Sequence, residues 1–220
     1  MLSAIKNCLQ RLYPYGIFTL PAPLLSEGGR GEAAKVAYLT FDDGPIPEVT
    51  PQVLAILAKY NIKATFFMVG ENIDKHSDIF AQVVQDGHSI GNHTYNHLKG
   101  WNCSNADYLA NVQKWEEAVH RTPYTIHHTP LFRPPYGKAT LSQRRTLHQL
   151  GYRIIYWDIL TQDYNPTRTP EYMLAKIKRQ VRPGSIINFH DSVKSNERML
   201  TVLPQAIEWL MQQGYTFAAL

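Results

Sequence analysis

Short apolar runs alternate with longer amphipathic stretches from residue 36 to the end of the chain. The short runs are rich in β-branched and aromatic residues, which predicts strands, and the longer stretches space their apolar residues three or four apart, which predicts helices. The expected strands are Val36–Phe41, Ala64–Val69, His88–Asn92, Leu131–Arg133, Arg153–Trp157, Ser185–Phe189 and Tyr215–Ala218. The expected helices are Val49–Tyr60, Asp78–Gln85, Ala106–His120, Ser142–Leu150, Pro170–Gln180 and Leu203–Gln213. Such alternation is typical of parallel β/α units.

Charged and polar side chains gather at the carboxyl ends of the expected strands. They are Asp42, Asp43, His93, Arg133, Asp158 and His190. Barrels and open α/β sheets place their active sites at this edge, so we expect these side chains to converge on one pocket. Seven strands in 220 residues fit a small, distorted (β/α) barrel better than a doubly wound open sheet, which is the structural alternative.

The first polar cluster, residues 40–45, reads Thr-Phe-Asp-Asp-Gly-Pro and follows a strand-like run. Adjacent side chains on an extended backbone point to opposite sides, so one of the two aspartates, Asp42 and Asp43, can bind a cation while its neighbour stays free as a base. Taken alone, the same residues are also typical of an ordinary turn, because Asp favours turns and Gly-Pro ends a strand.

A second cluster, residues 93–97, places His93 and His97 four positions apart. This spacing brings both imidazoles to one face if the residues form a helical turn. With one aspartate of the first cluster they offer three ligands to one metal ion. Such a set with one open position is what a catalytic zinc site requires, because the metal lowers the pKa of a bound water.

Three further polar clusters follow: Phe-Arg-Pro-Pro-Tyr-Gly at residues 132–137, Trp157-Asp158 through Asp163-Tyr164, and Asn-Phe-His-Asp-Ser at residues 188–192. In this order the five clusters resemble the five motifs of the NodB-type polysaccharide deacetylases, carbohydrate esterase family 4. The resemblance spans most of the chain. It implies a TIM-barrel-like, distorted seven-stranded (β/α) barrel, the NodB homology domain.

The resemblance also assigns roles position by position. It implies that Asp42 is the catalytic base, that Arg133 holds this base, and that Asp43, His93 and His97 bind the metal. His190 corresponds to the catalytic acid and Asp163 to the carboxylate that tunes it. Zinc fits these ligand types best, and the family also uses cobalt or nickel.

Four residues are expected to contact the substrate. The backbone N–H of Tyr136 corresponds to a donor that stabilises the oxyanion in the family, and the rings of Tyr136, Trp157 and Tyr164 can stack on sugar faces. Two positions depart from the family pattern: Tyr164 stands where Trp is common, and Asn188 where Leu is common. Because both positions shape the acyl pocket, we predict that Asn188 contacts a polar acyl or sugar group.

Length and composition limit the remaining possibilities. A chain of 220 residues, 44% hydrophobic, is long enough for one domain, which we place at residues 35–220 after an N-terminal extension, 1–34, that packs on it. The net charge of +4 comes without a nucleic-acid motif, and no apolar run approaches the ~20 residues of a membrane span. Prolines interrupt the uncharged stretch before residue 26, unlike a signal peptide, so we expect a cytoplasmic protein.

Three functions are compatible with these observations. The leading hypothesis is a metal-dependent hydrolase that removes N-acetyl or related acyl groups from an amino-sugar glycan. The second is a hydrolase of the same fold that acts on a non-sugar amide or a cyclic ureide. The third, which the complete set of seven catalytic and metal-binding residues argues against, is a glycan-binding pseudoenzyme without turnover.

Overall fold

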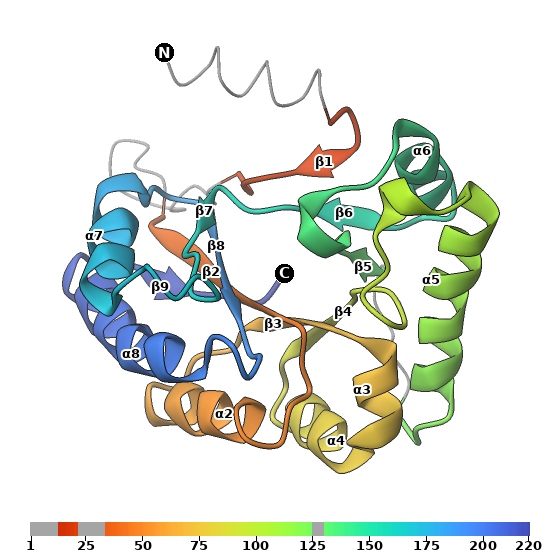
Figure 1. Ribbon diagram of the computed structural model, residues 1–220. Helices are drawn as coiled ribbons and strands as arrows, with labels where there is room; N and C mark the ends of the chain where they lie inside the picture. Colours follow the sequence, from red (N-terminus) through yellow and green to blue (C-terminus); the bar gives the residue numbers. More distant parts are fainter. Residues whose placement is uncertain (1–12, 22–33, 125–129) are drawn as a thin grey trace.

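The computed structural model describes residues 13–21, 34–124 and 130–220 (Figure 1). Parallel strands form one curled sheet in the order β1-β6-β5-β4-β3-β2-β8-β7, and β9 pairs with β2. The strands are β1 Gly16–Ile17, β2 Val36–Asp42, β3 Thr65–Met68, β4 Ser89–Asn92, β5 Leu131–Phe132, β6 Arg153–Ile155, β7 Ile159–Leu160, β8 Ser185–His190 and β9 Thr216–Phe217. The sheet is a half-barrel, which confirms the predicted fold class. β1 and β7, of two residues each, were not expected.

Helices cover the outside of the sheet (Figure 1). They are α2 Thr50–Lys59, α3 Gly70–Lys75, α4 Ser77–Gln85, α5 Asn105–His120, α6 Leu141–Gln149, α7 Pro170–Gln180 and α8 Asn196–Gln212, with short 3-10 turns η1 Gly100–Asn102 and η2 Pro135–Gly137. α3 was not predicted, because its single apolar residue gives no helical period. α8 begins seven residues before the predicted start at Leu203, because its first turn is polar and Pro204, which suits a helix start, lies inside it.

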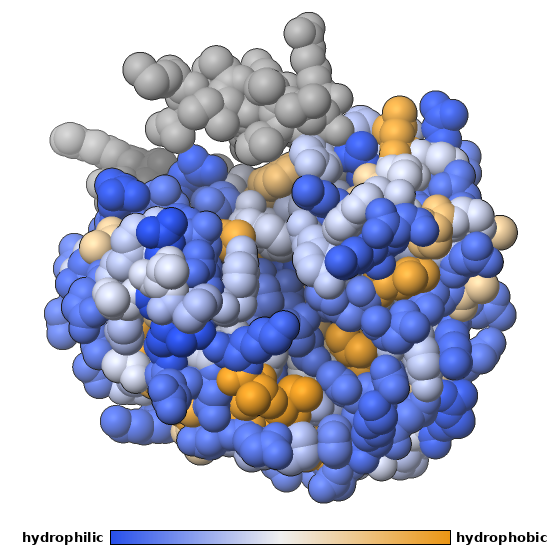
Figure 2. Space-filling model, in the orientation of Figure 1, coloured by the Kyte–Doolittle hydropathy of each residue, from blue (hydrophilic) through white to orange (hydrophobic). Residues whose placement is uncertain are grey.

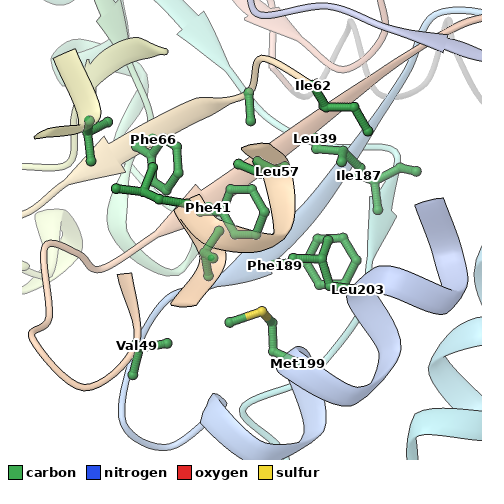
Figure 3. Close-up of a cluster of buried hydrophobic side chains, with 14 of the residues drawn as sticks. Leu39, Phe41, Val49, Leu57, Ile62, Phe66, Ile187, Phe189, Met199 and Leu203 are labelled. Atoms are coloured by element: carbon green, nitrogen blue, oxygen red, sulfur yellow. The ribbon is translucent and has the colours of Figure 1, made fainter. Parts of the chain in front are cut away.

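The alternation of side chains along β2 and β8 separates core from site. Phe41 and Phe189 are register partners and face outward, where they pack with Met199 and Leu203 of α8 (Figure 3). The next register pair is Asp42 and His190. Since successive side chains of a strand point to opposite faces, this pair faces the inside of the half-barrel, at the carboxyl ends of the two strands.

Apolar side chains fill the inside of the half-barrel below the site. Tyr38, Phe67, Leu131, Ile155 and Ile186 form this inner cluster, and each is almost completely buried. The polar residues of the five sequence clusters lie above it, at the edge where the strands end. The inner cluster therefore forms the floor on which the polar site rests.

Residues 13–21, the described part of the expected extension before residue 34, lie against the sheet. β1 pairs with β6, and the rings of Tyr13 and Phe18 contact Tyr156 at centroid distances of 5.1 and 4.8 Å. The division of the chain at residue 34 remains a prediction, since most of that extension lies outside the described residues. No helix within the described residues is long and apolar enough to span a membrane.

Candidate metal centre and active site

Asp43, His93 and His97 lie together at the carboxyl end of the sheet. The Asp43 Oδ1 atom is 3.7 Å from His93 Nε2 and 3.3 Å from His97 Nε2, and the three ligand atoms lie within 4.8 Å of one another. Oδ1 is buried and accepts no hydrogen bond from any described residue. One carboxylate and two imidazoles aimed at a common point fit a divalent cation such as zinc.

Both imidazoles are held in the form that binds a cation. The Nδ1–H group of His93 donates to the backbone oxygen of Arg133 at 2.7 Å, which leaves the lone pair of Nε2 directed toward Asp43. Burial, together with the neighbouring His93, lowers the pKa of His97 to about 4. His97 is therefore neutral at pH 7 before any cation binds.

The predicted helical turn between the two histidines is wrong. Residues 93–97 form an irregular loop in which Thr94 and His97 have φ angles of 63° and 57°. In a helical turn the backbone N–H groups would donate to carbonyl groups four residues back, but here two of them donate to side chains. The N–H of Thr94 donates to Asn92 Oδ1 at 2.8 Å, and the N–H of Tyr95 donates to Asn111 Oδ1 of α5 at 2.8 Å. These bonds bend the backbone so that the two rings meet at a centroid distance of 5.1 Å.

A second sharp bend separates the two aspartates. Asp42 ends β2, whereas Asp43 has a φ of 87°, so the backbone is not extended across the pair as expected. The Asp43 carbonyl accepts from Asn72 Nδ2 at 2.8 Å, and the N–H of Gly44 donates to Asp191 Oδ1 at 3.0 Å. A side chain at Gly44 would lie 2.1 Å from the Asp191 carboxylate, so only glycine fits. These contacts fix Asp43 toward the histidines and leave Asp42 inside the half-barrel.

Asp42 is a buried carboxylate with a donor on each oxygen. Arg133 Nη1 donates to Oδ1 at 2.7 Å, and Asn188 Nδ2 donates to Oδ2 at 3.0 Å. Burial disfavours the charged form, but Arg133, His93 and His190 together outweigh it and lower the pKa of Asp42. The residue is therefore an oriented carboxylate at neutral pH.

The structure does not place Asn188 in contact with a substrate. Its side chain is completely buried, lies outside the pocket wall, and has its amide occupied by Asp42, Arg133 and Thr40. Because Asn188 shares a register position with Thr40 on β2, it faces the interior one pair below the site. It therefore positions Asp42 instead of shaping an acyl pocket.

His190 and Asp163 form the second oriented pair. His190 Nδ1 lies 2.8 Å from Asp163 Oδ1, and the backbone N–H of His190 donates to Asp163 Oδ2 at 2.7 Å. Burial opposes the imidazolium, but the carboxylates of Asp163, Asp43 and Asp42 together outweigh it and raise the pKa of His190 to about 9. The imidazole is thus a proton donor at neutral pH, with its other ring nitrogen available to the pocket.

These groups line one pocket of about 670 Å³ in a face that is hollowed near its centre (Figure 2). The sequence-predicted residues in its wall are Asp42, Asp43, His93, His97, Tyr136, Trp157, Tyr164 and His190. Arg133 and Asp163 lie behind Asp42 and His190. Asp158, which follows an expected strand, lies elsewhere: it accepts from Ser185 and Ile186 at the amino end of β8.

Several wall residues carried no signal in the sequence. They are Ile46, Val69, Glu71, Asn72, Asn96, Leu160, Ser192, Val193 and Lys194. Most lie on connections after strands, where a single residue type does not indicate whether the residue lines a pocket. The apolar members, Ile46, Val69, Leu160 and Val193, form an apolar part of the pocket wall.

A curled parallel sheet with an Asp–His–His cluster at its carboxyl edge is the arrangement of the polysaccharide deacetylases. The chain belongs to this family: the family model "Polysaccharide deacetylase" matches residues 29–155, more than half of the 220 residues. A peptidoglycan-N-acetylglucosamine deacetylase of Bacillus cereus is 33% identical over 188 residues, covering 83% of this chain and 85% of that protein. A chitooligosaccharide deacetylase of Azorhizobium caulinodans is 34% identical over 176 residues, covering 76% and 81%.

Solved structures agree with this assignment. The crystal structure of the Bc1960 peptidoglycan N-acetylglucosamine deacetylase, in complex with 4-naphthalen-1-yl-N-oxidanyl-benzamide, superposes with a TM-score of 0.84. The two chains are 28% identical, and the match covers 96% of this chain and 94% of that one. The family resemblance inferred from the five clusters is therefore confirmed.

Replacement of His93 by alanine should abolish tight binding of a divalent metal, because two protein ligands form an inadequate first shell. Elemental analysis and zinc titration of the purified variant measure this loss. His120→Ala is the control, since His120 is exposed at the end of α5 and should leave the stoichiometry unchanged. Full metal content in His93→Ala would remove His93 from the site.

Replacement of Asn188 by leucine should lower turnover by about tenfold on every substrate tested, because Asp42 keeps Arg133 but loses its second donor. Kinetics with acyl groups of different size and polarity measure the effect. Asn188→Asp would instead place a second carboxylate beside Asp42 and should be more harmful. A change confined to one acyl group would restore Asn188 as a specificity residue.

Proposed function

We propose that the protein is a metal-dependent hydrolase that removes N-acetyl groups from an amino-sugar glycan. The observation that carries the proposal is the arrangement of two oriented pairs, Asp42 with Arg133 and His190 with Asp163, around the Asp–His–His cluster in one pocket. The names of the relatives, which act on peptidoglycan or chitooligosaccharides, support this substrate class.

Asp43, His93 and His97 would hold the cation, and their ligand types favour zinc, with cobalt or nickel as alternatives. A divalent cation bound there would supply a Lewis acid that makes water more acidic and polarises the amide carbonyl. Imidazoles bind a cation through the lone pair of the neutral ring, so two of them and one carboxylate would carry one negative charge and leave a divalent centre net positive. All other steps of the reaction belong to side chains of this chain.

Asp42 acts as the general base. Its carboxylate takes a proton from the attacking water as the water oxygen bonds to the amide carbon. Arg133 and Asn188 occupy one direction on each carboxylate oxygen, and each oxygen retains a further lone pair for the proton. The backbone N–H of Tyr136, in the turn beside His97, is assigned the stabilisation of the negative charge that develops on the carbonyl oxygen.

His190 acts as the general acid. As the carbon–nitrogen bond breaks, its imidazolium gives a proton to the nitrogen, so that the products are a free amine and acetic acid, which releases its proton to solvent as acetate. Asp163 keeps the ring protonated and fixes its orientation. The proton taken by Asp42 and the proton given by His190 balance the hydrolysis.

The rim of the pocket favours a glycan over a small cyclic ureide. Tyr136 and Tyr164 line the pocket and are 52% and 42% exposed, so they present ring faces to solvent beside the reacting groups. Rings of this kind stack on pyranose faces, whereas a small substrate would be enclosed and leave them unused. The complete set of seven catalytic and metal-binding residues argues against a pseudoenzyme.

Acetate release from N-acetylated chitooligosaccharides by zinc-loaded protein tests the proposal. Asp42→Asn should keep its metal and lose turnover by about 10²–10⁴-fold, the usual cost of removing a general base. Asp78→Asn, an exposed position on α4, is the control and should turn over normally. Loss of the metal in Asp42→Asn would make Asp42 a ligand, and absence of acetate with every N-acetylated glycan would refute the function.

The rate should fall as the pH rises through the pKa of His190, about 9, because deprotonation removes the general acid. Asp163→Asn removes the anion that favours the imidazolium, so the pKa of His190 falls and the alkaline limb of kcat moves to lower pH. The pH dependence of acetate release measures the shift. An alkaline limb at the same pH in both proteins would show that another group controls it.

A further inference from the structure

Two aromatic rings and two lysines form an exposed surface beside the pocket. We name Lys99, Trp101, Tyr136 and Lys138 the aromatic–lysine ledge. The Tyr136 ring lies 4.6 Å from the ring of His97 and 5.5 Å from the ring of Trp101, between ring centroids. Trp101 and Tyr136 are 43% and 52% exposed. The ledge therefore continues from the metal site outward over the protein surface.

The backbone beneath the ledge is anchored. Gln143 of α6 is buried, and its Nε2 donates to the carbonyl of Gly100 at 2.7 Å, which ties η1 and Trp101 to that helix. In η2, Gly137 packs so closely on Trp157 that a Cβ there would lie 2.8 Å from the indole. The rings therefore stand on fixed turns, which reduces the entropy cost of stacking a ligand on them.

The lysines of the ledge lie over its rings and carry uncompensated charge. Lys99 Nζ is 5.3 Å from the centroid of Tyr136, and Lys138 Nζ is 5.3 Å from that of Trp101. Among the described residues, no carboxylate forms a salt bridge with either ammonium group, whereas Lys75 pairs with Glu71 at 2.8 Å. Two positive charges beside exposed rings suit a ligand with a flat apolar face and a negative group.

The geometry points to a subsite for an acidic sugar. We propose that the aromatic–lysine ledge binds the sugar next to the one whose N-acetyl group enters the pocket, and that Lys99 and Lys138 bind a carboxylate on that neighbouring sugar. This inference rests on the proposed function and narrows its substrate class to N-acetylated glycans with carboxylate-bearing neighbours. A neutral oligomer can stack on the rings but leaves both ammonium groups without a partner.

Binding can be measured without turnover in the zinc-loaded Asp42→Asn protein. The probes are peptide-free strands that alternate N-acetylglucosamine with N-acetylmuramic acid, whose lactyl group carries a carboxylate, and the same strands with each carboxylate converted to an amide. We expect the charged strands to bind about tenfold more tightly, the effect of two exposed charge pairs, and the preference to shrink at high salt.

The double variant Lys99→Gln/Lys138→Gln should remove this preference, and in active protein it should raise KM for the charged strands more than for the amidated ones. Lys59→Gln/Lys178→Gln is the matched control, because it removes the same charge from two lysines that lie 5.1 and 5.5 Å from the rings of Tyr60 and Trp209, outside the pocket wall. It should keep the preference.

Equal affinity for charged and amidated strands in the Asp42→Asn protein with both lysines intact would overturn the inference. An equal loss for both strands in the ledge variant would also overturn it, since the lysines would then act through the fold or through stacking alone. Failure of the proposed function gives a different result. In that case the protein releases no acetate from charged strands or from neutral chitooligosaccharides.

Discussion

The guanidinium of Arg133 is buried inside the half-barrel, and the side chains of the site are arranged around it. It donates to Asp42 and Asn188 on β2 and β8 at 2.7 and 2.6 Å, and to the carbonyl groups of Ile155 and Tyr156 at 3.2 and 2.9 Å. A buried charge of this kind is costly unless every donor finds an acceptor. The surrounding strands supply those acceptors. The spacing of the strands therefore fixes the position of the guanidinium, and the guanidinium in turn holds the strands at that spacing.

The same residue connects Asp42, the proposed base, to the candidate metal ligands. Its side chain orients Asp42, while its backbone oxygen accepts from His93 and thereby fixes which ring nitrogen faces Asp43. The guanidinium also lies 4.0 Å above the ring of Phe67, so the apolar floor supports it from below. Base orientation, imidazole tautomer and core packing are therefore coupled through one side chain, and a change in any of them is transmitted to the others.

The sequence predicted most strands, and it predicted that Asp43, His93 and His97 come together, because apolar runs and the polar residues after them are local features. Polar residues after apolar runs, such as Asp42 and His190, reveal themselves by position. The bend at residues 93–97 was not predictable, because its donors are satisfied by Asn92 and by Asn111 of a distant helix. The hydrogen bonds of Asn188 were not predictable for a related reason: its partners Asp42, Arg133 and Thr40 are distant in the sequence.

Helix α5 has a part in the site that its place on the outside of the sheet conceals. Asn111 accepts from the backbone of Tyr95, the carbonyl of Val112 accepts from Asn92 Nδ2 at 3.1 Å, and Trp115 Nε1 donates to the carbonyl of Met68 at 2.7 Å. The helix thus holds the loop that carries both histidines in place from outside the sheet. A slide of α5 by one residue is a translation of about 1.5 Å, several times the roughly 0.2 Å within which metal–ligand distances are normally held. Sequence variation on this outer helix can therefore retune the metal centre while every residue in the pocket stays the same.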